Sequence, residues 1–361
     1  MNKGKKVFVA MSGGVDSSVT AALLKEREYD VTGITMRFHV AHPGDKKAPC
    51  CSDAELRDAR RMSKTLGIPH HIVDYSLEIN DHVIDHFMGE YLNGRTPNPC
   101  VRCNQLIKFG KLFEKSQSLG ADFLATGHYA KVCYNAEAGR FELKKARDLK
   151  KDQSYFLYQI NREILGKILF PLGELTKAEV RGLARRYKLD VAEKRESQDI
   201  CFVSDQGYKD FIRARMGEHV FEPGDFVDNN GKVVGQHKGI LNYTIGQRDQ
   251  LGIALGAPVY VYRIDKQTNT VYVGPEECLY AQGLTASQLN MVSMNIPAET
   301  MEVSARIRYN APEVKGFLTY LGQDRIRLEF AEPQKAVTPG QSAVFYHGDV
   351  MLGGAVIEEA M

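Results

Sequence analysis

The chain has 361 residues, of which 43% are hydrophobic and 25% charged, and its formal net charge is +2. This length is too great for one simple core and predicts two or three domains. No apolar run approaches the roughly 18 residues of a membrane span, and the apolar segment after MNKGKK is too short for a signal peptide. We therefore expect a cytoplasmic protein with no membrane partner. Seven cysteines in such a chain indicate catalytic, redox or metal-binding roles rather than a disulfide framework.

Apolar strand-like runs alternate with helical patterns in the first third of the chain. Strands are expected at 6–11, 31–38, 69–73 and 122–126, and helices near 16–27, 52–66, 79–91 and 105–119. This alternation predicts an α/β fold with a doubly wound parallel sheet. Ligands of such sheets bind at the carboxyl ends of the strands.

The residue pattern changes twice in the remainder of the chain. From about 154 to 216 the pattern is helical and rich in Lys and Arg, and after 221–239 strand-sized runs recur between Gly, Asn and Pro turns. This pattern predicts a small β domain followed by a β-barrel. We place the three domains at 1–212, 213–280 and 281–361.

The stretch VFVAMSGGVDSSVTAALL (7–24) joins the first strand to the first helix. Backbone N–H groups of a glycine loop, together with the helix N-terminus, form an anion cradle. Gly13 and Gly14 permit close approach of phosphate, while Ser12, Ser17 and Ser18 add hydroxyl donors. Asp16 would repel phosphate unless Mg²⁺ bridges the two. The lysine of the Walker pattern is absent. A plain strand-to-helix turn with serine caps is the alternative.

Two of the cysteines stand in polar segments with turn residues. Cys103 follows Arg102 within TPNPCVRCNQLIKFG (96–110), and Cys201 lies within ESQDICFVSD (196–205). A nearby cation lowers the pKa of a thiol and makes it a better nucleophile. The pair Cys100 and Cys103 could also be half of a zinc site. The lone residues Cys133 and Cys278 are interpreted as small hydrophobes, and Cys50 and Cys51 as loop residues of unknown role.

The loop SGGVDSS resembles that of the PP-loop ATPases, which transfer AMP to an oxygen and release pyrophosphate as a unit. In order along the chain, SGGVDSSV, TPNPCVRCN, IKFG, LATGHYA, KDQSYFLY, SQDICFV, YTIGQR and PGQSAVFY resemble the bacterial tRNA-specific 2-thiouridylase family. The match runs along essentially the whole chain. The resemblance implies an enzyme that replaces the C2 oxygen of the wobble uridine with sulfur.

The resemblance also implies a chemical sequence. Adenylation of the poorly reactive C2 oxygen by ATP creates a leaving group. Cys201 would carry a persulfide, and Cys103 would be the nucleophile that releases its sulfur. The two would end as a transient disulfide, or hydrogensulfide would be released and attack the uridine. An iron–sulfur cluster on Cys100, Cys103 and Cys201 is the alternative.

Further site residues follow from the same resemblance. The ATP contacts map to Ala10, Met11, Ser12, Gly13, Gly14, Val15, Asp16, Ser17, Met36 and Gly127, with Asp16 binding Mg²⁺. The target-base contacts map to Asn98, Pro99 and Cys100. Other tRNA contacts map to His128, Lys151, Asp152, Gln153, Arg308, Tyr309 and Gln341. The five cations of KKARDLKKD (144–152) indicate a phosphate-binding patch or a solvated face.

The implied partners are tRNAs, those for Lys, Glu and Gln in the family, and a sulfur-relay protein or cysteine desulfurase. Two other functions stay open at the level of sequence. One is an amidating PP-loop synthetase, which would need an ammonia source and leave Cys103 and Cys201 unexplained. The other is a non-catalytic RNA-binding protein, which would leave Asp16 and the serines without a purpose.

Overall fold

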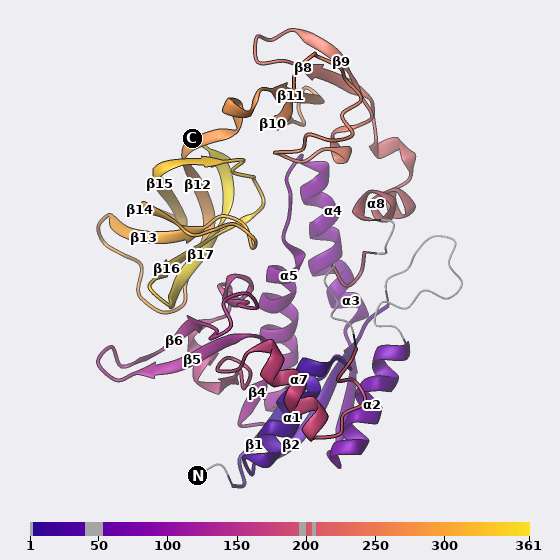
Figure 1. The fold of residues 1–361 in the computed structure, drawn as a ribbon, viewed down its shortest axis with the longest axis vertical. Helices are drawn as coiled ribbons and strands as arrows, with labels where there is room; N and C mark the ends of the chain where they lie inside the picture. The colour runs from indigo at the N-terminus through magenta and orange to yellow at the C-terminus, as the bar shows by residue number, and fades with distance from the viewer. Residues whose placement is uncertain (1–2, 40–52, 195–199, 204–206) are drawn as a thin grey trace.

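Three sheets organise the computed structural model, which describes residues 3–39, 53–194, 200–203 and 207–361 (Figure 1). The first is parallel throughout, in the order β3-β2-β1-β4-β7. Its strands are β1 (Lys6–Ala10), β2 (Asp30–Arg37), β3 (His70–Asp74), β4 (Phe123–Ala125) and β7 (Ile168–Leu169). The order reverses beside β1, so the carboxyl end of β1 is a switch point where ligands bind.

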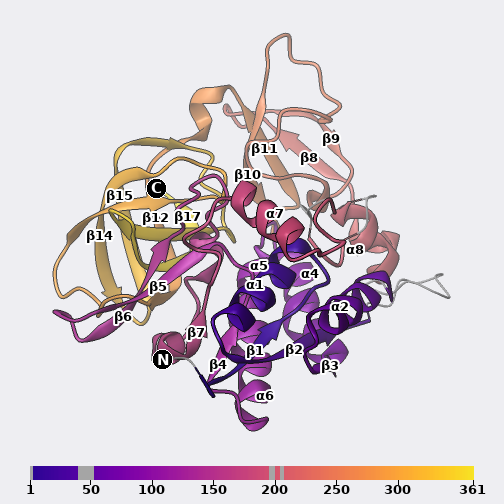
Figure 2. The ribbon, with the colours of Figure 1, turned by 60° about the horizontal axis from the view of Figure 1, so that its bottom comes forward.

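Helices cover both faces of this sheet (Figure 2). One face carries α1 (Val15–Glu26), α2 (Asp53–Leu66) and α7 (Lys177–Arg186). The other carries α3 (Ser76–Ile79), η1 (Asn80–Ile84), α4 (Asp85–Leu92), α5 (Pro99–Arg102), η2 (Cys103–Leu112) and α6 (Phe113–Ser118). Val7 and Val9 of β1 pack on the first face and Phe8 on the second, as the alternation of a strand requires.

The second sheet forms the middle of the chain, in the order β10-β11-β8-β9. Its strands are β8 (Gly224–Val227), β9 (Val233–His237), β10 (Tyr260–Asp265) and β11 (Thr270–Gly274), and α8 (Tyr208–Met216) precedes them. Short 3₁₀ turns are η5 (Glu218–Val220), η6 (Ile240–Asn242) and η7 (Glu276–Leu279). Phe226, Val261 and Val271 are fully buried in a separate small core.

The third sheet is a closed six-stranded barrel, in the order β12-β15-β14-β13-β16-β17 with β12 also paired to β17. Its strands are β12 (Tyr280–Met291), β13 (Met301–Arg306), β14 (Val314–Gly322), β15 (Arg325–Lys335), β16 (Ser342–His347) and β17 (Val350–Ala360). Closure removes the exposed edges that an open antiparallel sheet would have.

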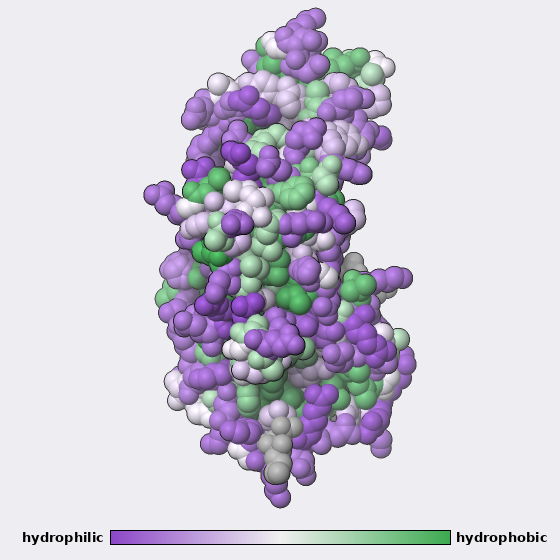
Figure 3. Space-filling view, turned by 90° about the vertical axis from the view of Figure 1, so that its left-hand side faces the viewer, coloured by the Kyte–Doolittle hydropathy of each residue, from purple (hydrophilic) through white to green (hydrophobic). Residues whose placement is uncertain are grey.

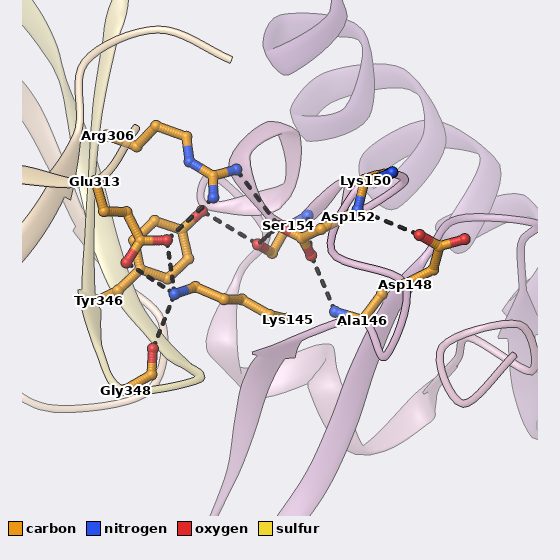
Figure 4. Close-up of polar contacts among 10 residues, drawn as sticks. All are labelled: Lys145, Ala146, Asp148, Lys150, Asp152, Ser154, Arg306, Glu313, Tyr346 and Gly348. Atoms are coloured by element: carbon orange, nitrogen blue, oxygen red, sulfur yellow. Dashed lines mark hydrogen bonds and ion pairs between the residues drawn. The ribbon is translucent and has the colours of Figure 1, made fainter. Parts of the chain in front are cut away.

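A hairpin from the N-terminal part of the chain extends the barrel. Strands β5 (Ala130–Asn135) and β6 (Arg140–Lys145) pair with each other, and β6 pairs with β17 through Lys144 and Leu143. In Figure 4, the Lys145 ammonium reaches across this junction to Glu313 at 2.6 Å and to the Gly348 carbonyl at 2.9 Å. The N-terminal part of the chain and the barrel therefore share one continuous hydrogen-bonded ladder.

The structure confirms the expected fold class, including the parallel sheet, the small β domain and the barrel. The expectation of a helical 154–216 segment is wrong. Among the residues of this range that the structure describes, only α7 and α8 are α-helical, while η3 (Ser154–Leu157) and η4 (Arg162–Lys167) are short 3₁₀ turns. Between η4 and α7, strand β7 and a turn at Pro171 and Gly173 interrupt the pattern, because neither residue favours a helix interior. Among the described residues, no helix has the length and apolar content needed to cross a bilayer.

Candidate active site

The loop between β1 and α1 has the geometry of an anion cradle. Gly13 has a φ of +72°, and a Cβ there would lie 2.5 Å from the Glu55 carbonyl oxygen, so only glycine fits. Gly14 caps α1 in an extended conformation, and α1 begins at Val15. The first N–H groups of α1 lack helical acceptors, so they and the positive end of the helix dipole favour an anion at this point.

The three serines of this loop differ in burial and in hydrogen bonding. Ser17 and Ser18 are buried, and their hydroxyls donate to the Gly14 carbonyl at 3.2 and 2.8 Å. Ser17 Oγ also accepts from the Ser12 backbone N–H at 3.2 Å. Ser12 is exposed and lies at the surface of the loop. Ser17 and Ser18 therefore shape the cradle in this state, and Ser12 is the hydroxyl placed to meet a ligand.

A lysine from α7 neutralises the carboxylate of Asp16. Lys177 Nζ donates to both carboxylate oxygens, at 2.8 and 2.9 Å, and the Tyr129 hydroxyl donates to one of them at 2.9 Å. The side chain of Lys177 is only 11% exposed, and 161 positions separate it from Asp16 in the chain. The cation that is missing from the loop sequence is thus supplied by a distant helix, which the sequence analysis did not find.

A second lysine approaches the other side of the loop. Lys194 Nζ bonds Asp58 of α2 at 2.7 Å and the Gly13 carbonyl at 3.3 Å. It immediately precedes residues 195–199, which lie outside the described part of the chain. The loop therefore lies between two lysines, each of which is paired with a carboxylate in this state.

The remaining expected ATP contacts lie at strand ends around the loop. A Cβ on Gly127, just after β4, would lie 2.9 Å from the Ser17 nitrogen, so this glycine allows the two segments to touch. Met36 lies near the end of β2 and is half-buried. Ala10 ends β1, while Met11 is buried and donates its N–H to the Ile34 carbonyl.

His128 is held as a neutral imidazole beside Gly127. Burial, with the Lys108 cation nearby, holds the pKa of His128 well below its usual range. Its Nδ1 lies 2.6 Å from the Thr126 hydroxyl, and its ring packs between Phe109 and Phe170. The hydrogen bond through Nδ1 leaves Nε2 as the atom available to a ligand.

Cys100 and Cys103 follow Asn98, which caps α5 by accepting from the Val101 N–H. Cys103 is a half-buried free thiol, and burial raises its pKa while the Lys108 cation opposes that rise. Cys100 retains contact with solvent, yet the protein atoms around its thiol still desolvate it and raise its pKa. At Cys103, for which the sequence suggested activation by Arg102, burial outweighs any such effect, and Lys108 is the cation that favours the thiolates of Cys100 and Cys103.

Cys201 is exposed, and its neighbour Phe202 anchors it to the fold. The Phe202 ring packs edge-on against Phe87 of α4, with ring centroids 5.3 Å apart. The adjoining η1 contacts α5, where Arg102 Nε donates to the His82 carbonyl. Cys201, the residue predicted to carry the persulfide, is therefore joined through Phe202 to the helical layer that also contains Cys103.

Metal binding was expected at two places. Within the described residues, no group of three or more His, Cys, Asp and Glu side chains is arranged to hold a metal ion. Cys100, Cys103 and Cys201 are thus not arranged as a metal site in the part of the chain that the structure describes. Mg²⁺ differs because it needs only one or two carboxylates when phosphates supply the other oxygens, so Asp16 fits that role.

The barrel fixes the segment that contains the expected target-base residues Asn98, Pro99 and Cys100. The Gln341 amide donates to the Thr96 carbonyl at 2.8 Å, and the Thr96 N–H donates to the Pro339 carbonyl at 2.9 Å. Pro99 is buried at the start of α5. Gln341, which was expected to contact tRNA, therefore fixes the chain segment that leads from Thr96 to Asn98.

Arg308 and Tyr309 follow β13 and lie close to η3. The Tyr309 ring packs on Phe156 with centroids 4.4 Å apart. Arg308 donates to the carbonyls of Lys335 and Ala336, and burial lowers its pKa. Both residues remain half-buried, so each keeps part of its side chain accessible.

Asp152 and Gln153 make internal contacts. Asp152 is 2% exposed and accepts from the Ala146 N–H at 3.0 Å and the Ser154 hydroxyl at 2.8 Å (Figure 4). Its carboxylate also lies 3.6 Å from the Arg306 guanidinium of the barrel. The Gln153 side chain accepts from the Tyr129 N–H at 3.0 Å. Gln153 thus supports the tyrosine that reaches Asp16, whereas Asp152 stabilises the junction with the barrel.

The 144–152 patch is more neutralised than its sequence suggests. Lys144, Lys145 and Arg147 pair with Glu142, Glu313 and Glu179, respectively. Lys150 is exposed and Lys151 half-exposed at its end.

Four other cysteines stand apart from this site or outside the described residues. Cys133 on β5 and Cys278 in η7 are half-buried, which suits the interpretation as small hydrophobes. Cys50 and Cys51 lie outside the described residues.

Taken together, the parallel sheet and the anion cradle at the end of β1 define the α/β class of nucleotide-binding enzymes. Models of the tRNA methyl transferase HUP domain, the tRNA methyl transferase PRC-barrel domain and the aminomethyltransferase beta-barrel domain match residues 5–205, 209–275 and 281–357. The tRNA-specific 2-thiouridylase MnmA of Carboxydothermus hydrogenoformans is 49% identical over 360 residues, covering 99% of this chain and 98% of the relative. MnmA 1 of Caldanaerobacter subterraneus subsp. tengcongensis is 48% identical over 362 residues, covering 99% of each chain.

The chain therefore belongs to the tRNA-specific 2-thiouridylase (MnmA) family of tRNA sulfurtransferase enzymes. This assignment confirms the resemblance in the sequence. It supports neither the amidating synthetase nor the non-catalytic RNA-binding protein.

Proposed function

We propose that the enzyme adenylates the C2 oxygen of the wobble uridine of tRNA and replaces that oxygen with sulfur from a persulfide on Cys201. The observation that carries this proposal is the packing of the two residues, Gly127 and His128, that lie just beyond the end of strand β4. Gly127 packs against the anion cradle, and the adjacent His128 shares the Lys108 cation with Cys103. A uridine at this point would lie between the nucleotide and the thiols.

The first half of the reaction uses the cradle. Loop N–H groups would hold the pyrophosphate portion of ATP while the uridine C2 oxygen attacks the α-phosphorus and pyrophosphate leaves. Bound Mg²⁺ would supply charge neutralisation between Asp16 and the phosphates. Lys177 is placed to stabilise the negative charge that develops on the leaving pyrophosphate, because its ammonium already lies at the mouth of the loop.

The second half uses the thiols. The Cys103 thiolate attacks the Sγ atom of the Cys201 persulfide, which forms the Cys103–Cys201 disulfide and releases hydrogensulfide. Hydrogensulfide then adds to C2, and AMP leaves with the original oxygen. In the alternative order, the terminal persulfide sulfur attacks C2 first and Cys103 cleaves the S–S bond afterwards. Both orders give 2-thiouridine, AMP and one disulfide, which a reductant must reopen before the next turnover.

The tRNA contacts belong to this proposal as well. We assign base contacts to Asn98, Pro99 and Cys100, and other tRNA contacts to His128, Lys151, Asp152, Gln153, Arg308, Tyr309 and Gln341. On the face seen in Figure 3, polar side chains predominate toward the edges and apolar residues gather along the middle. The polar edges of this face suit a wet interface of the kind that nucleic acids form.

The test is mass spectrometry of nucleosides from tRNA incubated with the enzyme, ATP, Mg²⁺ and a persulfide donor, followed by the same reaction with free sulfide. Wild type should produce 2-thiouridine in both reactions. Cys103→Ser and Cys201→Ser should fail with the persulfide donor, whereas the control Cys278→Ser should keep activity because it lies in the middle domain. Release of AMP without any thiolated nucleoside would refute the assigned substrate while leaving nucleotide cleavage intact.

A further inference from the structure

Two side chains of different kinds hold Asp16, the carboxylate that fits Mg²⁺. Lys177 Nζ donates to both carboxylate oxygens, whereas the Tyr129 hydroxyl donates to Oδ1 at 2.9 Å. The Asp16 side chain is still 30% exposed, and its two oxygens have about four lone-pair positions between them. These bonds therefore leave room on the carboxylate for a metal ion.

The fold holds Tyr129 in one place. The residue is 3% exposed and belongs to the core on the face of the parallel sheet that carries α1 and α7. Its backbone N–H donates to Gln153 Oε1 at 3.0 Å, and its carbonyl accepts from the Gln153 N–H at 2.8 Å. Because the ring and both backbone groups are held, the core determines where the hydroxyl lies.

The same short segment also restrains the rest of Asp16. A Cβ on Gly127 would lie 3.0 Å from the Asp16 Cβ, so the chain after β4 packs directly against this residue. The Asp16 backbone belongs to α1, and its carbonyl accepts from the Thr20 hydroxyl at 2.8 Å. With the backbone and Cβ fixed, the orientation of the carboxylate group depends on the donors that it meets.

The two donors differ in their compatibility with a bound metal ion. The Lys177 ammonium ends a flexible four-carbon stem and repels a dication on the same carboxylate. The Tyr129 hydroxyl is neutral and its ring is packed, so it can keep its bond to Asp16 when the metal binds. Mg²⁺ requires near-ideal octahedral geometry, so the orientation of a ligand carboxylate affects its affinity.

We propose that Tyr129 is a positioning residue for AMP transfer: its hydroxyl holds the Asp16 carboxylate in the orientation that binds Mg²⁺ together with the phosphates of ATP. This inference rests on the proposed function, because that function gives Asp16 its metal ion. Hydrogen-bond partners of this kind orient metal-ligating carboxylates, and losing one weakens metal binding by roughly 10- to 100-fold.

The experiment titrates a non-hydrolysable ATP analogue into Tyr129→Phe by calorimetry, at a series of Mg²⁺ concentrations and in EDTA. The variant keeps the buried ring and loses only the hydroxyl. The half-saturating Mg²⁺ concentration should rise by roughly 10- to 100-fold, whereas the Kd in EDTA should stay within about twofold of wild type, because Tyr129 acts through the metal ligand. Tyr134→Phe, on β5 and 59% exposed, is the matched control and should behave as wild type in both titrations.

A double variant tests whether Tyr129 acts through Asp16. Asp16→Asn removes the metal-ligating carboxylate, so adding Tyr129→Phe to it should cause no further change in Kd at any Mg²⁺ concentration. Additive losses in the double variant would overturn the inference. An equal loss of affinity by Tyr129→Phe in Mg²⁺ and in EDTA would overturn it as well, because that result indicates a purely structural role.

The outcomes separate this inference from the function on which it rests, because the titrations contain no tRNA. Binding of the ATP analogue that is independent of Mg²⁺ in wild type would overturn the role of Tyr129, while formation of 2-thiouridine would still support the proposed function. If wild type formed no 2-thiouridine, the proposed function would fail. A Mg²⁺ dependence that is weakened in Tyr129→Phe alone would then still support the role of Tyr129.

Discussion

Replacing Lys177 with methionine should weaken binding of Mg²⁺–ATP. The side chain is 11% exposed, and its ammonium lies 2.8 and 2.9 Å from the two oxygens of Asp16 at the mouth of the anion cradle. The substitution removes a cation from the phosphate site and leaves the Asp16 carboxylate with less compensating charge. A hydrogen bond to a charged group contributes about 1.5–3 kcal/mol, which corresponds to a roughly 10- to 100-fold rise in Kd.

Isothermal titration calorimetry with Mg²⁺ and a non-hydrolysable ATP analogue measures this change directly. The matched control is Arg185→Met, which removes a cation from the same helix where the side chain is 61% exposed and pairs with the exposed Glu193. The control should bind with the wild-type Kd. A Lys177→Met enzyme with a normal melting temperature and a Kd within twofold of wild type would show that the lysine serves only to hold α7 against the loop.

Three further predictions concern the loop, the thiol and the barrel junction. Gly13→Ala should abolish ATP binding in the same titration, because the added Cβ would lie 2.5 Å from a backbone oxygen; retained affinity would contradict this geometry. Alkylation of Cys103, followed across pH by peptide mass spectrometry, should have its midpoint above the ordinary thiol value of about 8.5, since burial raises its pKa; Lys108→Met should move the midpoint higher still, and a downward shift would be inconsistent with a cationic role for Lys108. Asp152→Ala should destabilise the protein by about 2–4 kcal/mol, seen as a lower melting temperature, because it leaves buried donors without their acceptor; the exposed Glu137→Ala is the control, and equal melting temperatures would refute the structural role.

Local signals made much of the catalytic part predictable. Each strand of the parallel sheet before Gly127 is a short apolar run, and the anion cradle is a contiguous motif, so neither depends on distant contacts. The hairpin β5–β6 was missed although its alternating residues flank the turn sequence AEAG, which was a usable signal. The 154–216 segment was predicted as helical from its residue pattern, yet strand β7 and the turn at Pro171 and Gly173 interrupt that pattern.

Lys177 could be placed on a helix but not in the site. Thr176 and Glu179 form a capping box, a pattern that the sequence TKAE displays and that identifies the start of α7. Nothing in that pattern says that α7 packs beside α1 or that the first side chain of the helix reaches Asp16. The same holds for Lys108, which the sequence places two residues before the end of its motif but whose effect on His128 and Cys103 depends on tertiary packing.

The β6–β17 pairing has a mechanical consequence for substrate selection. The β6–β17 ladder, reinforced by Lys145 and Glu313, ties the barrel to the segment that leads to Tyr129 and the cradle. The distance from the barrel residues Arg308 and Tyr309 to the thiols is then constrained by this pairing. Under the proposed function, an RNA bound at Arg308 and Tyr309 would present its uridine to Cys103 only if its own curvature matches that span, so we expect the enzyme to discriminate RNAs by shape.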